Sequence, residues 1–361
     1  LSDYSPSDLY PYAPPQGKEP LRKAWRDKLL RENPSLNEKA FGMPIVTNAL
    51  THGLSIVADL FVNAGDPIVW PDKFWGNYNL TFAVRRGARF ATFPLFSTEQ
   101  SFNVLGLKQQ LLAQQEHNKA IVLLNFPNNP TGYTPGQAEV DEIVSVIKEV
   151  AETGMKLVVV TDDAYFQLFY EDSIQESIFG RLANIHSNVL AVKVDGATKE
   201  EFVWGFRVGF ITYASESENV LHALEEKTKG IIRATISSSP HPSQSFILKS
   251  LQSERFELEK REKFAVLKSR AHKVKAVLNS GKYDDAWSYY PFNSGYFMCL
   301  SVKGVNAEKL RLHLLHEYGV GTISINETDL RIAFSSVDEE DIEKLFDLIY
   351  QGVKELQNED C

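Results

Sequence analysis

Residues 194–210 read VDGATKEEFVWGFRVGF. The apolar run that leads into them, residues 188–194, predicts a buried strand, and a turn of small residues then carries Lys199. Arg207 follows shortly before a second strand-like run at residues 210–213. A strand that brings one amine to a fixed point, with a guanidinium returning toward it, suits a lysine that forms a covalent imine beside a phosphate held by the arginine. A surface lysine in a loop is the alternative, and the rest of the chain decides between them.

The composition is that of an ordinary globular protein. The chain has 361 residues, a length that is enough for two domains. Its residues are 43% hydrophobic and 24% charged, as in soluble globular proteins. Its net charge of −9 argues against nucleic acid or an anionic membrane surface as the main partner, and no apolar run reaches membrane-spanning length. Two cysteines, Cys299 and Cys361, give no disulfide framework and no metal-ligand spacing, so we expect a reducing, cytoplasmic setting. Because the sequence begins at Leu1 instead of methionine, we expect its N-terminus to be incomplete.

From about residue 44 the pattern alternates between helices and buried strands. Amphipathic spacing predicts helices at residues 19–31, 50–62 and 139–152. Apolar runs predict strands at residues 68–70, 88–93, 120–124, 157–160 and 189–194. Strands that alternate with helices indicate βαβ units and a mostly parallel sheet, in which ligands lie at the carboxyl ends of the strands.

The second half of the chain has a different pattern. A long charged helix is predicted at residues 243–278, and it links the large domain to a second one. The remainder reads as α+β, with strands at residues 296–301 and 330–334 and helices at residues 307–318 and 339–357. We therefore expect a large domain over residues 1–258 and a small C-terminal domain over residues 259–361.

Several predicted strands end in side chains with useful chemistry. Residues 125–132, NFPNNPTG, form a rigid turn whose amides can donate hydrogen bonds into a cleft. In DDAY, Asp162 can hold a proton on a heterocyclic nitrogen and Tyr165 can bond a phenolic oxygen. Thr51 begins a helix that can bind phosphate, and Trp75 can stack on a flat ring. Each has a plainer interpretation as a turn, a cap or a core residue, but together they match what pyridoxal phosphate needs.

On NNPTG, DDAY, the K…GFRVG stretch and LRIAF, in this order, the whole chain resembles the fold-type I pyridoxal-phosphate-dependent class I aminotransferases, with aspartate and aromatic enzymes as relatives. The resemblance implies an α/β fold: a large domain with a mixed, mostly parallel sheet flanked by helices, and a smaller α+β domain. It implies that Lys199 binds the cofactor covalently and is the catalytic base, with Asp162 at the ring nitrogen and Tyr165 at the phenolic oxygen. The other implied cofactor contacts are Asn129 at the phenolic oxygen, Trp75 stacked on the ring, and Leu50, Thr51 and Arg207 at the phosphate.

The resemblance also implies substrate and partner contacts. Tyr12 matches the tyrosine that reaches the phosphate of the neighbouring subunit, which implies a homodimer with shared active sites. Arg331, in LRIAF, matches the arginine that grips the substrate α-carboxylate, with Asn129 and Trp75 also at the substrate. Arg233 falls where aspartate aminotransferases bind the side-chain carboxylate across the interface, and an ion pair at the surface is the alternative.

Two positions depart from the family pattern. Gly196 stands where relatives usually place a phosphate-binding serine, and Ala49 replaces a small hydroxyl residue or glycine. We expect phosphate binding to be weaker, or to depend more on backbone N–H groups and Arg207.

The implied function is transamination from an L-amino acid, aspartate and/or aromatic, to a 2-oxo acid such as 2-oxoglutarate, by a ping-pong mechanism. A pyridoxal-phosphate-dependent carbon–sulfur lyase on the same scaffold stays open, because it shares the cofactor residues. A third reading is a non-catalytic, aminotransferase-like regulatory domain, but the sequence has no basic helix-turn-helix segment of the kind fused to such domains. The expected partners are small-molecule substrates and a second copy of the chain, with no nucleic acid and no membrane.

Overall fold

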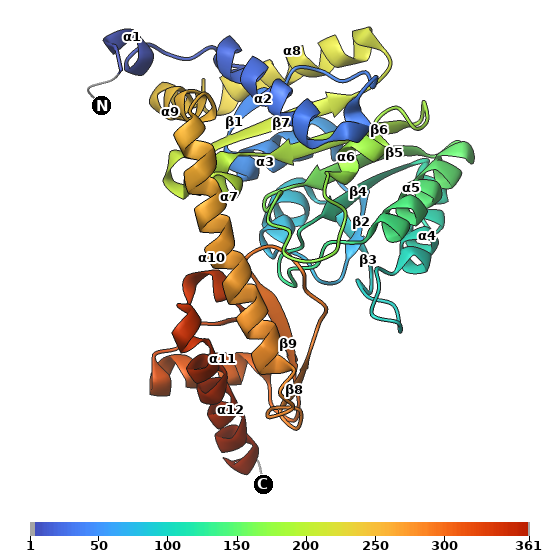
Figure 1. The fold of residues 1–361 in the computed structure, drawn as a ribbon. Helices are drawn as coiled ribbons and strands as arrows, with labels where there is room; N and C mark the ends of the chain where they lie inside the picture. Colours follow the sequence, from blue (N-terminus) through green and yellow to red (C-terminus); the bar gives the residue numbers. More distant parts are fainter. Residues whose placement is uncertain (1–3, 360–361) are drawn as a thin grey trace.

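A computed structural model describes residues 4–359, and Figure 1 shows two sheets joined by a long helix, α10. The strands of the larger sheet are β1 (Ile45–Asn48), β2 (Pro67–Pro71), β3 (Arg89–Phe93), β4 (Lys119–Asn125), β5 (Lys156–Asp162), β6 (Val189–Asp195) and β7 (Val208–Ala214). The helices before α10 are α1 (Pro6–Leu9), α2 (Glu19–Glu32), α3 (Ala49–Phe61), α4 (Val104–Leu112), α5 (Gln137–Glu152), α6 (Ile178–Leu182), α7 (Ala197–Glu200), α8 (Glu218–Thr235) and α9 (His241–Leu251).

The strand order of the larger sheet is β1-β7-β6-β5-β4-β2-β3. Strands β3, β2, β4, β5 and β6 pair in parallel, while β7 runs antiparallel to both β6 and β1. The sheet is therefore mixed and mostly parallel, as predicted. Asn125 pairs with Asp162, and Asp162 with Val194, so the loops after β4, β5 and β6 leave the same edge side by side.

The two faces of the larger sheet belong to different cores. Along β4, Ile121 and Leu123 lie in one core, whereas Ala120, Val122 and Leu124 lie in the other. This is the alternation expected of a strand buried on both sides. The first core includes α3 and continues into the smaller sheet, and the second is covered by α2, α4, α5, α6 and α9.

The smaller sheet is antiparallel, with the order β10-β11-β9-β8. Its strands are β8 (Trp287–Tyr289), β9 (Met298–Val302), β10 (Ile323–Ser324) and β11 (Asp329–Ile332). The helices from α10 on are α10 (Glu254–Leu278), α11 (Ala307–Tyr318) and α12 (Ile342–Glu359). Short 3-10 turns occur at Pro34–Leu36, Gln115–His117, Trp204–Phe206, Phe334–Ser336 and Glu339–Asp341, and Asn79–Val84 is a π-helix.

One predicted helix is wrong in its continuity. Residues 243–278 form two helices, because the backbone at Ser253 is extended and starts α10 anew (φ −103°, ψ 120°). The break lets α9 pack on α2 while α10 runs on to the smaller sheet. The predicted boundary after residue 258 falls inside α10 and stays a prediction. Within residues 4–359, no helix is long and apolar enough to cross a membrane.

Candidate active site

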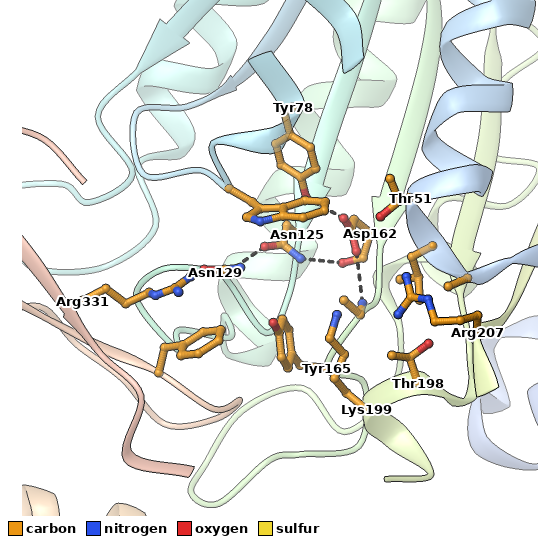
Figure 2. A pocket seen from close by; sticks show the side chains of 15 residues that line it. Thr51, Tyr78, Asn125, Asn129, Asp162, Tyr165, Thr198, Lys199, Arg207 and Arg331 are labelled. Atoms are coloured by element: carbon orange, nitrogen blue, oxygen red, sulfur yellow. Dashed lines mark hydrogen bonds between the residues drawn. The ribbon is translucent and has the colours of Figure 1, made fainter. Parts of the chain in front are cut away.

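A cavity of about 240 Å³ lies at the carboxyl edge of the larger sheet (Figure 2). Nine of the eleven residues predicted for the site line it: Leu50, Thr51, Trp75, Asn129, Asp162, Tyr165, Lys199, Arg207 and Arg331. Four further side chains line the cavity that were not among the predicted site residues: Tyr78, Asn125, Thr198 and Phe297. Residues far apart in the chain therefore meet where the parallel-sheet rule places a ligand.

Lys199 projects into this cavity from α7, the single helical turn that follows β6. Its Nζ atom lies 4.9 Å from the centre of the Tyr165 ring. Burial lowers the pKa of Lys199, Asp162 partly opposes this shift, and the nearby Arg207 guanidinium adds to it. A lysine with a lowered pKa offers more of the neutral amine, which is the form that attacks a carbonyl or accepts a proton.

Asp162 ends β5, and its carboxylate is 2% exposed. The Tyr78 hydroxyl donates to Oδ2 at 2.6 Å, and the Ala164 backbone N–H donates to Oδ1 at 3.1 Å (Figure 2). Burial raises the pKa of Asp162, while the hydrogen bond from Tyr78 and the charge of Lys199 lower it. The carboxylate is thus held in one orientation by neutral donors, ready for a cationic N–H group from a ligand.

Aromatic rings and amides build the walls between these two groups. The Trp75 and Tyr78 rings pack edge to face at 5.6 Å, and Phe297 packs edge to face on Tyr165 at 5.5 Å. The Asn125 Nδ2 atom donates to the backbone carbonyl of Asp162 at 2.8 Å, and its Oδ1 accepts from the Asn129 backbone N–H at 2.8 Å. The cavity is therefore flanked by flat rings and bounded by fixed amides, which suits a planar heterocycle.

The end of the cavity near Arg207 has the features of an anion site. Thr51 lies in the first turn of α3, where backbone N–H groups have no partner within the helix. The Thr198 side chain is 2% exposed, and its hydroxyl has no hydrogen-bond partner among the described residues. Figure 2 shows Thr198 beside Arg207. A phosphate here would satisfy the buried hydroxyl and balance the guanidinium charge.

Steric crowding explains why position 196 is a glycine. A Cβ atom there would lie 2.6 Å from both the Gly209 Cα atom and the Val208 carbonyl oxygen. A serine therefore does not fit without a backbone shift. The available hydroxyl comes instead from Thr198, at the position just before Lys199. Ala49, the other departure, adopts a left-handed φ of 61° at the start of α3.

Arg331 enters the cavity from β11 of the smaller sheet. Its Nη1 atom donates to the Asn129 Oδ1 atom at 2.8 Å, and its guanidinium lies 4.2 Å from the centre of the Phe297 ring. The remaining N–H groups of the guanidinium can form the two parallel bonds that a carboxylate accepts.

Tyr12 and Arg233 do not join these residues. Both line a second hollow with Ala13, Pro15, Ser237 and Ser238. Tyr12 is 91% exposed, and Arg233 Nη1 donates to the Ser237 hydroxyl at 2.5 Å. Within one chain, therefore, neither residue reaches the cavity that holds Lys199.

Most of these four further residues stand beside predicted site residues in the sequence. Tyr78 belongs to the same PDKFWGNY stretch as Trp75, Asn125 opens NFPNNPTG, and Thr198 precedes Lys199. For each of these three residues, a neighbour in the sequence was a predicted site residue or part of a predicted site turn. Whether the side chain itself points into the cavity depends on local backbone geometry, which the sequence does not reveal. Phe297 lies within the strand predicted at residues 296–301 and had no such neighbour. Within residues 4–359, no group of three or more His, Cys, Asp and Glu side chains could hold a metal ion.

The donor set fits pyridoxal phosphate. Asp162 is a buried acid bonded only to neutral donors, as a protonated ring nitrogen requires. The unpaired Thr198 hydroxyl and the α3 N-terminus fit a phosphate, and Lys199 lines the same cavity.

Comparisons with known proteins agree with this geometry. Residues 4–349 match the family model "Aminotransferase class I and II". The chain is 26% identical to an aspartate aminotransferase of Bacillus sp. (strain YM-2) over 60% of this chain and 51% of that protein, and 27% identical to one of Musicola paradisiaca over 62% and 53%. The chain thus spans about half the length of the curated relatives it matches.

A solved structure is similar over more of the chain. An aminotransferase from Anaerococcus prevotii has a TM-score of 0.86 and 26% identity, over 98% of this chain and 85% of that one. Pyrococcus horikoshii kynurenine aminotransferase, at 17% identity and a TM-score of 0.82, shares the fold over 98% and 84%. With the family model matched from residue 4 to residue 349, the chain belongs to the class I and II aminotransferases, a family that depends on pyridoxal phosphate.

Proposed function

We propose that this protein moves an amino group from an L-amino acid, aspartate and/or aromatic, to a 2-oxo acid such as 2-oxoglutarate, by a ping-pong mechanism. The observation that carries the proposal is the pair formed by Lys199 and Asp162, which face one cavity and influence each other's pKa. The family membership and the aspartate aminotransferases among the relatives support it.

Pyridoxal phosphate, when bound, supplies an electron sink that acidifies the substrate α-carbon. Lys199, whose pKa is lowered, is the proposed base. Its amine would take the proton from the substrate α-carbon and return it to the carbon of the cofactor that carried the aldehyde. Asp162 would hold the proton on the ring nitrogen of the bound cofactor, and the hydrogen bond from Tyr78 fixes the orientation of that carboxylate. Burial keeps the pKa of Tyr165 raised, so its hydroxyl stays protonated and can donate a hydrogen bond.

Arg331 is the proposed site for the α-carboxylate of the substrate. Its contact with Asn129 at 2.8 Å leaves it facing the same cavity as Lys199. A carboxylate bound there would bring the α-carbon toward the Lys199 amine, so binding and proton transfer use one geometry.

We also propose a homodimer in which Tyr12 and Arg233 serve the partner's cavity. Their separation from Lys199 within one chain, and the 91% exposure of Tyr12, support a role between subunits. The low cysteine content supports a cytoplasmic location.

The test is product analysis on the cofactor-loaded protein. Aspartate, tyrosine, phenylalanine and alanine are each supplied with 2-oxoglutarate, and the 2-oxo acid formed from each donor is measured. We expect product that depends on the acceptor. In a parallel assay without acceptor, pyruvate and ammonia formed by elimination from a thioether amino acid such as cystathionine would instead indicate a carbon–sulfur lyase. No reaction in either assay would count against both activities.

A further inference from the structure

Asp329 is a fully buried carboxylate at the start of β11. Its Oδ2 atom lies 2.8 Å from the Lys73 ammonium, and its Oδ1 atom accepts from the Tyr290 hydroxyl at 2.9 Å. The Asn326 amide donates to Oδ2 at 2.8 Å, and the Thr328 hydroxyl donates to Oδ1 at 3.2 Å. Both oxygen atoms are thus engaged, and Lys73 is the partner that comes from the other part of the molecule.

Lys73 belongs to the loop after β2, in the same PDKFW stretch as Trp75. It is 9% exposed, with its ammonium 5.0 Å from the centre of the Tyr290 ring. Burial by itself would lower the pKa of Lys73, but the carboxylates of Asp329 and Asp72 raise it above its ordinary value. Lys73 therefore stays charged, and the ion pair crosses from the larger sheet to the smaller one.

A second contact crosses the same gap close by. Asp329 and Arg331 stand two positions apart on β11, so their side chains share one face of the strand. Arg331 reaches Asn129 in the loop after β4, at 2.8 Å. That loop is joined to the first one, because the Asn128 amide donates to the Lys73 carbonyl at 3.2 Å. Two loops and one strand thus close into a ring of contacts.

We propose that the Lys73–Asp329 ion pair positions Arg331 for the substrate carboxylate by fixing β11 against the loops that carry Trp75 and Asn129. The inference rests on the proposed role of Arg331. Lys73 and Asp329 touch neither cofactor nor substrate in this scheme and act through the strand. Without the pair, Arg331 keeps its bond to Asn129 and its contact with the Phe297 ring, and β11 keeps its pairing with β9 and β10, but the strand loses one of the two side-chain links described here to the loops after β2 and β4.

The first test replaces Lys73 with methionine in the cofactor-loaded protein. We expect KM for the amino donor, and Kd for succinate as a simple carboxylate probe, to rise roughly tenfold, with kcat changed less than about threefold, because carboxylate binding is what depends on Arg331. Lys73→Arg keeps the charge and should restore most of the affinity. The matched control is Lys119→Met, which breaks a part-buried pair with Asp66 at the opposite end of β4 and should leave both constants unchanged.

The second test asks whether Lys73 acts through Arg331. In an Arg331→Lys background, the further change Lys73→Met should have little additional effect on KM, because the group being positioned is gone. Lys73→Met/Asp329→Asn removes both charges, leaves no unpaired buried carboxylate, and should raise the succinate Kd as Lys73→Met does. This pair of changes covers the case in which Lys73→Met alone does not fold.

Two results would overturn the inference: an unchanged succinate Kd in the folded double variant, or equal effects of Lys73→Met with and without Arg331. Succinate that binds the wild-type protein while no amino acid is turned over would refute the proposed transamination and leave the positioning role measurable. A wild-type protein that binds no succinate would remove the carboxylate role of Arg331, and the inference with it.

Discussion

Two lysines on the same strand and turn have opposite environments. Lys193, in β6, is fully buried and contacts Asp163 and, at 3.5 Å, Asp195. Burial lowers its pKa, but the two carboxylates outweigh burial and raise the pKa above its ordinary value. Lys199, just after β6, is also mostly buried, yet its pKa is lowered. Burial outweighs the attraction of Asp162, the carboxylate that opposes it among the described residues, and Arg207 adds a like charge. Both lysines are buried, so the contact with carboxylates, and not the degree of burial, distinguishes the structural Lys193 from the reactive Lys199.

The two aspartates of DDAY divide in the same way. Asp162 turns into the cavity, toward the Tyr78 hydroxyl. Asp163 turns to the other side, where it meets Lys193 and accepts from the Ser177 hydroxyl at 2.5 Å. Adjacent residues at the end of a strand point to opposite faces, so one aspartate serves the cavity and the other neutralises a buried lysine.

Lys199 is also followed by two buried acids that it does not contact. Glu200 pairs with Lys28 of α2, and Glu201 lies 3.4 Å from Lys28 and 3.1 Å from Lys260 of α10. Burial raises the pKa of Glu200, and the nearby lysines lower that of Glu201 against the effect of burial. The turn that carries Lys199 is thus anchored to two helices, while Lys199 forms no salt bridge with any carboxylate among residues 4–359.

The largest expected effect is that of Lys199→Ala. Because Lys199 is the proposed base and covalent attachment point, turnover should fall on the order of 10⁴-fold or more. The change in cofactor absorbance on adding an amino donor should be lost as well. Lys108→Ala, which removes a lysine that pairs with Glu149 at the surface, should behave as wild type. A Lys199→Ala protein with normal turnover would refute the assignment.

Lys193→Met tests the structural half of the comparison. It leaves Asp163 and Asp195 buried without their cation, so the free energy of unfolding should fall by about 3–5 kcal/mol. Urea unfolding measures this change. The control, Lys148→Met, disrupts an exposed pair with Glu152 and should cost no more than about 0.5 kcal/mol. Equal losses in the two variants would mean that the buried pair does not hold the sheet together.

The larger sheet could be predicted from the sequence because its strands are apolar runs. Strands buried on both faces, such as β4 and β5, leave a continuous signal, and the quoted motifs mark the ends of those strands. Eight of the predicted site residues line one cavity for the same reason, because the loops and helical turns that carry them meet at one edge of the larger sheet, whereas Arg331 reaches the cavity from β11 of the smaller sheet. The break at Ser253 was missed because the charged pattern continues across it. Thr198 was not predicted as a site residue. Its role as the phosphate-end hydroxyl follows from the close approach of the backbone at Gly196, and a sequence pattern does not reveal such an approach.

In the cofactor-free protein, the contributions of Lys199 and Lys193 to the free energy of unfolding should change with alkaline pH in opposite directions. The lowered folded pKa of Lys199 means that its contribution to the free energy of unfolding rises with pH between that value and the ordinary one of about 10.4. The raised folded pKa of Lys193 means that its contribution is complete below about 10.4 and is lost as pH rises through the folded value.

Urea unfolding from about pH 8 upward measures both slopes, neither of which can exceed about 1.4 kcal/mol per pH unit. The difference between wild type and Lys199→Met should grow with pH. The difference between wild type and Lys193→Met should shrink, and only above about pH 10.4. Slopes of the same sign would contradict the contrast between the two environments.

The smallest expected effect is that of Tyr78→Phe. It tests whether the Tyr78 hydroxyl keeps the Asp162 carboxylate charged for a protonated ring nitrogen. The Tyr78 hydroxyl lowers the pKa of Asp162 against the effect of burial, and its removal should raise that pKa further. The carboxylate then holds a ring-nitrogen proton less well, so affinity for pyridoxal phosphate should fall by about 1–1.5 kcal/mol, or roughly tenfold. Titration of the cofactor-free protein, followed by absorbance, gives the Kd. Tyr213→Phe removes a buried hydroxyl bonded to Thr228 at 2.7 Å, outside the cavity, and should leave this Kd unchanged. If both variants bind the cofactor as wild type does, the Tyr78 hydroxyl is not what prepares Asp162 for the ring nitrogen, and the difference between Asp162 and the equally buried Asp163 lies in the Lys193 ammonium that contacts Asp163.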